Sequence, residues 1–278
     1  LQPQPKQAHR QPIHDTIKVS LQRVENLVEM IGELVIVESM VVNAPEIQGL
    51  GSRRVQNYLN QLTKITRDLQ EVGMRMRMVP VRGIFLKMAR LVRDLAKRNG
   101  KQINFVQSGE ATEMDRSMVE LIDGPLLHLI RNAVDHGIES SEERQTHNKP
   151  ASGTIRLSAY HQGGKIVIEV ADDGRGLSRE RILAEAQAHG SIGDVSELSD
   201  NDIFNLIFLS GLSTTEQVSQ ISGRGVGMDV VKRTIESMQG RVLVLSEATK
   251  GTTFKLVLPL TLAIIDGMLV SCGKEQYI

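Results

Sequence analysis

The sequence has few of the residues that mark several common classes of protein. Its 278 residues include one cysteine, Cys272, which rules out an internal disulfide and favours a reducing, cytoplasmic location. Tryptophan is absent and aromatic residues make up only 3%, which disfavours stacking platforms for single-stranded nucleic acid. Lysine and arginine number 33, as do aspartate and glutamate, so the excess positive charge of a DNA-binding protein is missing. We therefore expect no nucleic-acid partner.

Long apolar runs are also missing. The most apolar stretch, 256–270, contains Pro259 and Asp266 and is shorter than the about 20 residues that a membrane helix needs. No signal peptide is visible, so we predict no membrane insertion. The chain begins with Leu1 and ends inside a strand-like segment, so we expect a piece of a longer protein with about two domains.

The N-terminal third has the apolar spacing of two long helices. Residues 1–15 are polar and contain proline, as in a linker, and the helical pattern begins at Thr16. Apolar residues recur in steps of three and four in both helices, at Ile17, Leu21, Val24, Val28, Ile31 and Val35, and at Val55, Leu59, Leu62, Ile65, Leu69, Val72 and Met76. We predict an antiparallel helical hairpin over 16–78. A lone hairpin cannot bury stripes this wide, so we expect a homodimeric four-helix bundle through 16–76. Packing against another part of the same chain is the alternative.

The rest of the chain alternates helices and strands, which indicates an α+β protein. Residues 74–83 (MRMRMVPVRG) predict an extended hinge, and a second domain follows over 83–259. We expect one of its helices over 115–138, interrupted at 123–125, where Asp123 would cap a new start and Pro125 would lie in the first turn. Further predicted helices are 84–98, 178–189, 200–209 and 226–239, and predicted strands are 102–107, 154–160, 165–171, 241–246 and 252–258. Residues 210–227, rich in Gly, Ser and Thr, suit a mobile lid.

One helix carries an unusual set of polar residues. His128, Asn132, Asp135 and His136 stand at i, i+4, i+7 and i+8, which places them on one stripe. The Asn132 amide oxygen suits Mg²⁺, which prefers oxygen and takes few protein ligands beside phosphate. His128, one turn earlier, can hydrogen-bond a γ-phosphate or its acceptor. The alternative is a solvated polar face with an Arg131–Asp135 pair.

The segment DDGRG at 172–176 follows a predicted strand and precedes a predicted helix. Gly174 and Gly176 allow the backbone to approach a ligand closely, and Asp172 can accept a hydrogen bond from the exocyclic amine of adenine. A common Asp-Gly turn, or a fragment of a Ca²⁺ loop without the remaining EF-hand spacing, is the alternative.

Two further glycine-containing segments complete the pattern. Glycine amides at a helix start favour phosphate, and GRGVG at 223–227 opens a predicted helix. No strand precedes it, so it is not a Rossmann fingerprint, and the chain has no conventional P-loop. KGTT at 250–253 begins a strand, where a hydroxyl can support the base-binding carboxylate. The alternative for GRGVG is a lid hinge, and the alternative for KGTT is an ordinary turn.

The four segments together identify a resemblance. HLIRNAVDHGIE, DDGRG, SGRGVGMDVVK and KGTTF closely resemble the N, G1, G2 and G3 boxes of the chemotaxis histidine kinase family CheA. The hairpin is similar to the dimerisation domain of this family and MRMRMVP to its hinge. PLTLAIIDGMLV at 259–270 resembles the start of its SH3-like coupling domain. We expect this domain at 260–278, where it is truncated. The resemblance covers nearly all of the chain after residue 13.

The resemblance implies the α/β sandwich shared by histidine kinases, gyrase B and MutL. It also implies site roles: Asn132 binds Mg²⁺, His128 and His136 lie near the phosphates, Asp172 binds the adenine amino group and Thr253 supports the base. The implied ATP-binding set is Asn132, Asp135, His136, Asp172, Gly174, Gly176, Gly223, Arg224, Gly225, Gly227 and Thr253, with His128 and Asn132 as catalytic residues. In the lid, Leu212 replaces the phenylalanine that is common in this family.

The function implied is a protein-histidine kinase core. It would bind ATP and Mg²⁺ and transfer the γ-phosphoryl group to a histidine on a separate phosphotransfer domain, with response regulators downstream. Adaptor and chemoreceptor would bind through the coupling domain. One alternative is a gyrase- or MutL-type ATPase, but its glutamate base would precede Asn132 by one turn, where His128 stands. The other is a non-catalytic nucleotide-binding scaffold. His14 precedes the first helix without the proline pattern of an acceptor histidine, so we do not expect it to be phosphorylated.

Overall fold

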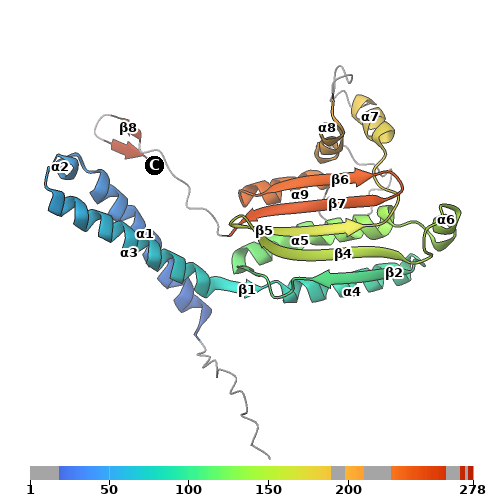
Figure 1. The fold of residues 1–278 in the computed structure, drawn as a ribbon, viewed down its shortest axis with the longest axis horizontal. Helices are drawn as coiled ribbons and strands as arrows, with labels where there is room; N and C mark the ends of the chain where they lie inside the picture. Colours follow the sequence, from blue (N-terminus) through green and yellow to red (C-terminus); the bar gives the residue numbers. More distant parts are fainter. Residues whose placement is uncertain are drawn as a thin grey trace, which may run out of the picture. The chain divides into compact units, whose positions relative to one another are not determined.

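The computed structural model describes residues 19–49, 51–188, 198–209, 227–260, 270–272 and 275–277. The chain divides into two compact units between Arg77 and Met78 (Figure 1). The expected linker at 1–15, the expected lid up to residue 226 and most of 260–278 lie outside the described residues. No helix in the described part of the chain combines the length and apolarity that a membrane span requires.

The first unit is a helical hairpin, as predicted. It consists of α1 (Leu21–Asn43), α2 (Pro45–Gln48) and α3 (Arg53–Arg77). The expected helix start at Thr16 is wrong, because Val19 and Ser20 lie outside α1 and Ser20 has the extended conformation of a residue that precedes a helix. The two long helices approach closely at Gly73, where an added Cβ would lie 2.8 Å from Cδ1 of Ile31. Val24 and Ile31 are buried between the helices.

Both long helices leave an apolar stripe exposed on this single copy of the hairpin. The stripe follows steps of three and four on each helix, and its members are Leu27, Met30, Leu34, Val37 and Val41 on α1 and Leu62, Ile65, Leu69, Val72 and Met76 on α3. Their side chains are 36–59% exposed. The contacts within the hairpin therefore bury a different stripe from the one that these ten residues form.

The predicted hinge is shorter than expected. Residues 74–77, expected to be extended, form the last turn of α3, because methionine and arginine are good helix formers. Only β1 (Met78–Pro80) is extended, since Pro80 disfavours helix at the residue before it. This strand pairs antiparallel with β3 (Glu113–Asp115).

The second unit is a five-stranded mixed sheet with helices on one face (Figure 1). The strand order is β2-β4-β5-β7-β6, and only β2 and β4 are parallel. The strands are β2 (Ile103–Ser108), β4 (Gly153–Gln162), β5 (Lys165–Asp172), β6 (Arg241–Glu247) and β7 (Gly251–Pro259). Gly163 and Gly164 both have positive φ and make the predicted hairpin turn between β4 and β5.

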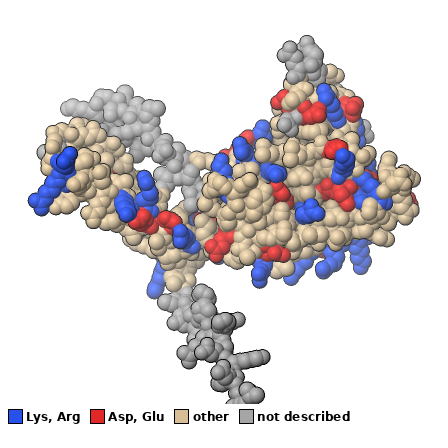
Figure 2. Space-filling model, in the orientation of Figure 1, with Lys and Arg blue, Asp and Glu red and all other residues tan. Residues whose placement is uncertain are grey.

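Three helices cover the sheet: α4 (Arg82–Arg98), α5 (Arg116–Asn132) and α9 (Met228–Ser237). The other helical elements of this unit are η1 (Ala133–Gly137), α6 (Ser141–Thr146), α7 (Arg179–Ala188), α8 (Asp200–Asn205) and η2 (Leu206–Phe208). A single apolar core lies between helices and sheet and includes Phe85, Met88, Ile122, Leu126, Leu129, Ile155, Leu157, Ile168, Phe254 and Leu256. Acidic and basic side chains are interspersed on the visible face of this unit (Figure 2). The strands β8 (Val270–Cys272) and β9 (Glu275–Tyr277) pair antiparallel with each other.

The interruption expected at 123–125 is wrong. Helix α5 begins after Asp115, whose carboxylate accepts a hydrogen bond from the Ser117 amide at 2.8 Å, and it continues through Pro125. Pro125 lacks an amide hydrogen and removes one helical bond. Burial of Pro125 itself and of its apolar neighbours offsets this loss. Asp123 is not a cap but an ion-pair partner of Lys87, at 2.5 Å.

Candidate functional site

The polar stripe of the central helix does not lie on one face. Helix α5 ends at Asn132 and continues as the π-helical turn η1, whose wider turn rotates the following residues away from their α-helical positions. Asn132 faces α9, with its amide nitrogen 3.3 Å from the sulfur of Met228. Asp135 faces the end of α4 and accepts a hydrogen bond from Asn99 at 2.7 Å. Asn132 and Asp135 therefore contact different neighbours, and His136 is exposed to solvent.

Lys101 fixes the end of the π-helical turn. Its ammonium group donates to the carbonyl oxygens of Val134, Asp135 and Ile138 at 2.7, 2.9 and 2.8 Å. Burial lowers the pKa of Lys101, and the neighbouring Asp135 opposes this shift. The turn that Lys101 holds ends at Gly137, which contacts the next part of the site.

Asp172 lies at the carboxyl end of β5, beside this turn. Its carboxylate accepts a hydrogen bond from the Gly174 amide at 2.9 Å and another from the Thr252 amide. A Cβ added to Gly137 would lie 3.2 Å from the carboxylate, and one added to Gly174 only 2.1 Å from the Gly137 carbonyl oxygen. Gly174 is thus required where the helix end meets the DDGRG turn, and a side chain at Gly137 would push against the Asp172 carboxylate.

Gly251 makes a similar approach from β7. Its φ is +117°, and an added Cβ would lie 1.9 Å from the backbone oxygen of Asp172. Gly176 has a φ of +73° and packs in the same way against Glu247. Gly137, Gly174 and Gly251 thus allow three segments that are distant in sequence to meet at Asp172.

The surroundings of Asp172 disfavour its charge. Burial raises the pKa of this carboxyl to about 6, although the amides of Gly174 and Thr252 act in the opposite direction. Asp173 and Glu139 add to the increase through their negative charges. At neutral pH the group is ionised and acts as a hydrogen-bond acceptor with an elevated affinity for a donor.

A cavity of about 350 Å³ opens at this end of the sheet. Asp172 and Thr253 both line it, so the structure brings these two predicted residues together. The other lining residues are Asp200, Phe204, Leu245, Ser246, Glu247, Lys250 and Gly251. Asn132 and His128 are not among them. They lie instead at the interface of α5 with the start of α9.

The start of α9 lies beside the predicted metal ligand. Gly227 precedes the first residue of α9, and the next residue, Met228, contacts Asn132. Burial, and secondarily the charge of Arg131, lowers the pKa of His128, whereas Asp229 in the first turn of α9 raises it. His128 is therefore neutral at pH 7. Gly223, Arg224 and Gly225 lie outside the described residues.

Sequence analysis did not single out several residues of the site. The buried Thr252 lies next to Thr253, its amide holds Asp172, and its hydroxyl is 3.1 Å from that of Ser246. Ser246 in turn accepts a hydrogen bond from the Leu177 amide at 2.8 Å. The sequence could have indicated Thr252, because side chains alternate between the two faces of β7. Thr252 therefore shares the inward face with Phe254 and Leu256.

Comparison with known families decides the identity of this domain. Residues 123–262 match the family model described as histidine kinase-, DNA gyrase B-, and HSP90-like ATPase. This match spans half of the chain. The chain belongs to this ATPase family. Residues 14–76 match a second model, described as the homodimeric domain of signal transducing histidine kinases. The α+β fold expected from the sequence, a helical hairpin followed by an ATPase domain of this family, is confirmed.

Within the family, the chain is similar to chemotaxis proteins named CheA. It is 47% identical over 265 residues to CheA of Klebsiella aerogenes, covering 95% of this chain and 40% of that protein. It is 47% identical over 264 residues to CheA of Salmonella typhimurium, covering 95% and 39%, and 42% identical over 264 residues to CheA of Rhizobium meliloti, covering 95% and 35%. The expected resemblance to CheA is confirmed, and the chain spans two fifths or less of the length of these relatives.

Proposed function

We propose that this ATPase-family chain is the core of a protein-histidine kinase of a two-component, chemotaxis-type system in the cytoplasm. It binds ATP with Mg²⁺ and transfers the γ-phosphoryl group to a histidine on a separate phosphotransfer domain. The carboxylate of Asp172, ionised at the wall of a cavity of about 350 Å³, is the observation that carries this proposal. The similarity to CheA over 95% of the chain supports the choice of reaction.

Asp172 recognises the base. Its carboxylate accepts a hydrogen bond from the adenine amino group, whereas guanine presents an acceptor at the equivalent position and is disfavoured. The amides of Gly174 and Thr252 orient the carboxylate, and Thr253 lies at the cavity wall beside it. Gly174 and Gly176 let the DDGRG turn pack closely against Gly137 and Glu247.

Asn132 is the proposed Mg²⁺ ligand. Its amide nitrogen is directed to the Met228 sulfur, which leaves the oxygen without a partner in the described part of the chain. An uncharged oxygen fits a cation that keeps several waters and shares phosphate oxygens. When bound, Mg²⁺ supplies positive charge that neutralises the phosphates. Asp135, His136, Arg224 and the glycines at 223, 225 and 227 complete the proposed nucleotide site.

The chemistry requires positioning more than activation. A neutral imidazole nitrogen of the acceptor carries a lone pair and attacks the γ-phosphorus, and the bond to the bridging oxygen breaks as ADP leaves. His128 is neutral at pH 7 because burial lowers its pKa, so it can orient the γ-phosphoryl group or the acceptor through a hydrogen bond. His128 also stands where a gyrase-type enzyme needs glutamate, which favours transfer over hydrolysis.

Labelled ATP tests this function. The chain is incubated with [γ-³²P]ATP, Mg²⁺ and an added phosphotransfer domain, with an acceptor His→Gln variant of that domain as control. We expect label on the intact domain only, and none when the chain carries Asn132→Ala. Free phosphate without labelled domain would indicate a gyrase-type ATPase, and nucleotide binding without either product would indicate a scaffold.

The proposed assembly follows from the family and from the exposed stripes of the hairpin. We propose a linker at 1–15, a homodimerisation domain at 16–78 that pairs through 16–76, and a kinase domain at 83–259. The start of an SH3-like coupling domain at 260–278 would connect the kinase to an adaptor and a chemoreceptor. Response regulators would then receive the phosphoryl group. Light scattering at rising protein concentration tests the dimer.

A further inference from the structure

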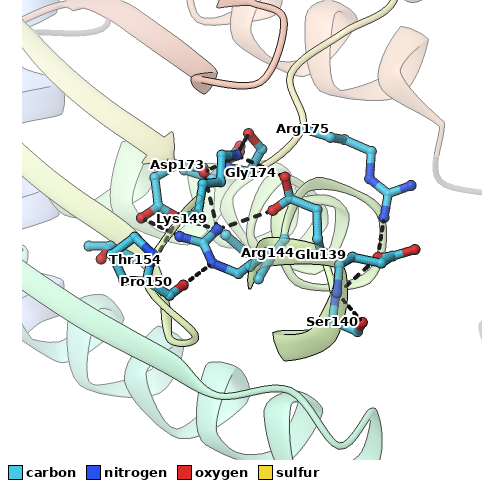
Figure 3. A network of polar contacts seen from close by, with 12 residues as sticks. Glu139, Ser140, Arg144, Lys149, Pro150, Thr154, Asp173, Gly174 and Arg175 are labelled. Atoms are coloured by element: carbon cyan, nitrogen blue, oxygen red, sulfur yellow. Dashed lines mark hydrogen bonds and ion pairs between the residues drawn. The ribbon is translucent and has the colours of Figure 1, made fainter. Parts of the chain in front are cut away.

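An ion-pair network holds the DDGRG turn (Figure 3); Arg144 and Glu139 in it are buried, whereas the Asp173 side chain is 39% exposed. At its centre is Arg144 of α6, whose side chain is 1% exposed. Its guanidinium group binds both carboxylate oxygens of Asp173, at 3.0 and 3.1 Å, and one oxygen of Glu139 at 3.1 Å. It also donates to the carbonyl oxygens of Pro150 at 2.7 Å and Asp173 at 3.2 Å. All of its donor nitrogens are thus engaged.

Lys149 completes the network with a second cation. Its ammonium group binds the other oxygen of Glu139 at 2.8 Å and the carbonyl oxygens of Asp173 and Gly174 at 2.9 and 2.7 Å. Burial favours the neutral form of Glu139, but the hydrogen bond from Lys149, a backbone hydrogen bond and the charges of Lys149 and Arg144 together outweigh it and lower the pKa of this carboxyl. The network therefore pairs two acidic side chains with two basic ones.

The network fixes the residues that follow Asp172 and avoids the cavity itself. Asp173 is held through its side chain and its carbonyl oxygen, and its carboxylate also accepts a hydrogen bond from the Thr154 amide at 2.8 Å. The next residue, Gly174, is held through its carbonyl oxygen and donates its amide to Asp172. None of the four network residues lines the cavity in which Asp172 lies.

Stability alone is a weak explanation for such a network. Removing charges from water carries a large penalty, and buried ion pairs are often no more stabilising than apolar residues of the same volume. A bidentate arginine, however, sets the position of a carboxylate and of its backbone with high directional precision. That property matters where the adjacent residue must meet a ligand within a few tenths of an ångström.

We propose that Arg144 is a positioning residue for base recognition: with Glu139 and Lys149 it holds Asp173 and Gly174 so that the Asp172 carboxylate points at the adenine amino group. Arg144 touches no substrate and acts through Asp172 alone. This inference rests on the proposed function, because it presumes that Asp172 selects adenine.

The test compares the affinities of ATP and GTP, measured by equilibrium binding to the full chain. Arg144→Met removes the clamp, and we expect ATP to bind about tenfold more weakly while GTP is unchanged, so that the ATP:GTP preference falls about tenfold. Asp173→Asn keeps the shape of the turn and weakens the clamp, so it shifts the preference in the same direction with less risk to folding. Arg156→Met, at an exposed position on the neighbouring strand, is the matched control and leaves the preference unchanged.

Repeating the Arg144→Met comparison in a protein that already carries a substitution at Asp172 separates a positioning role of Arg144 from a purely structural one. In an Asp172→Ala protein, the acceptor that Arg144 orients is gone, so adding Arg144→Met changes neither affinity further. A purely structural role would weaken both nucleotides equally in both backgrounds and would overturn the inference. An unchanged ATP:GTP preference in folded Arg144→Met and Asp173→Asn proteins would also overturn it. If the unaltered chain does not prefer ATP, the proposed function fails first and the inference falls with it.

Discussion

At the scale of single residues, the site keeps a charge where the protein disfavours one. Asp172 accepts a hydrogen bond more strongly when it is charged, yet burial raises its pKa from 3.8 to about 6. Below about pH 4 the group is protonated in both the folded and the unfolded chain and has no effect. Between about pH 4 and 6 only the unfolded chain is ionised, so the folded state loses stability as pH rises, and above about 6 the full penalty is present.

We therefore expect Asp172→Asn to stabilise the second unit while it weakens ATP binding. The expected gain in the free energy of unfolding is about 2–3 kcal/mol at pH 7.5, because each pKa unit corresponds to about 1.4 kcal/mol. Urea denaturation at pH 7.5 and pH 4 measures it, and the gain should vanish at pH 4. Asp200→Asn at the cavity rim is the control and should change stability little, since its ion pair with Arg179 is exposed. An equal gain at both pH values would refute the explanation.

His128 belongs to the same scale and has a different role. Burial lowers its pKa below the ordinary value of 6.5, so the neutral form predominates at pH 7. We expect His128→Gln to bind ATP within about threefold of the unaltered chain but to slow phosphoryl transfer on the order of 10²-fold. Single-turnover transfer to an added phosphotransfer domain measures the rate, with the exposed His161→Gln as control. Undiminished transfer with normal ATP binding would remove His128 from the mechanism.

At the scale of elements, regular periodicity was the reliable part of the sequence. It predicted the five strands of the sheet, the Gly163-Gly164 turn and the two long helices of the hairpin, because apolar residues there follow the period of the element that they form. The same rule failed after Asn132. A π-helical turn inserts a wider step that no residue type indicates, so the contact of Asp135 with Asn99 at the end of α4 was not predicted.

The ion-pair network was hidden for a different reason. Residues 139–152 are polar and suit an exposed loop, and nothing in their order says that Arg144 is buried. Its partners Glu139, Lys149 and Asp173 are brought together only when the turn after β5 packs against α6. Tertiary packing, not local pattern, decided this part of the site. Gly137 and Gly251 lie in the predicted motifs but were not named as site residues, since the need for glycine there arises from contacts with another segment.

Lys101 gives a prediction at this scale, because it supports a whole turn. Lys101→Met leaves three carbonyl oxygens at the end of η1 without their donor. We expect a loss of about 1–3 kcal/mol in the free energy of unfolding, the usual effect of unsatisfied buried polar groups. ATP binding should weaken as well, because Gly137 at the end of η1 contacts Asp172. Urea denaturation and ATP titration measure the two effects.

Lys97→Met is the matched control for this prediction. Lys97 also lies near the end of α4, but its side chain is exposed. We expect a change within about 0.5 kcal/mol, as for most surface substitutions. If Lys97→Met and Lys101→Met were equally destabilising, the carbonyl contacts of Lys101 would not explain the loss.

At the scale of the whole molecule, the hairpin is incomplete as a single copy. Ten apolar residues on α1 and α3 repeat in steps of three and four and remain 36–59% exposed. A regular exposed stripe on each of two neighbouring helices has the spacing of a helical seam, and a second hairpin with the same stripes would cover it. The seam that is already buried, with Val24 and Ile31, joins the two helices of one chain. The sequence contained both seams, but only the structure shows which one is used within the chain.

The homodimer prediction can be tested on the exposed seam without disturbing the buried one. Leu69→Glu places a charge in the α3 stripe, where its neighbours one turn away are Ile65 and Val72. We expect dimer dissociation to become at least about 100-fold easier, because a charge buried in an apolar interface must shed its water without a partner. Multi-angle light scattering over a dilution series measures it, and circular dichroism checks that the hairpin stays helical. Gln61→Glu adds the same charge outside the stripe and should leave the dimer intact. If both variants, or neither, shifted the equilibrium, this stripe would not be the dimer interface, and its exposed residues would need a partner of another kind.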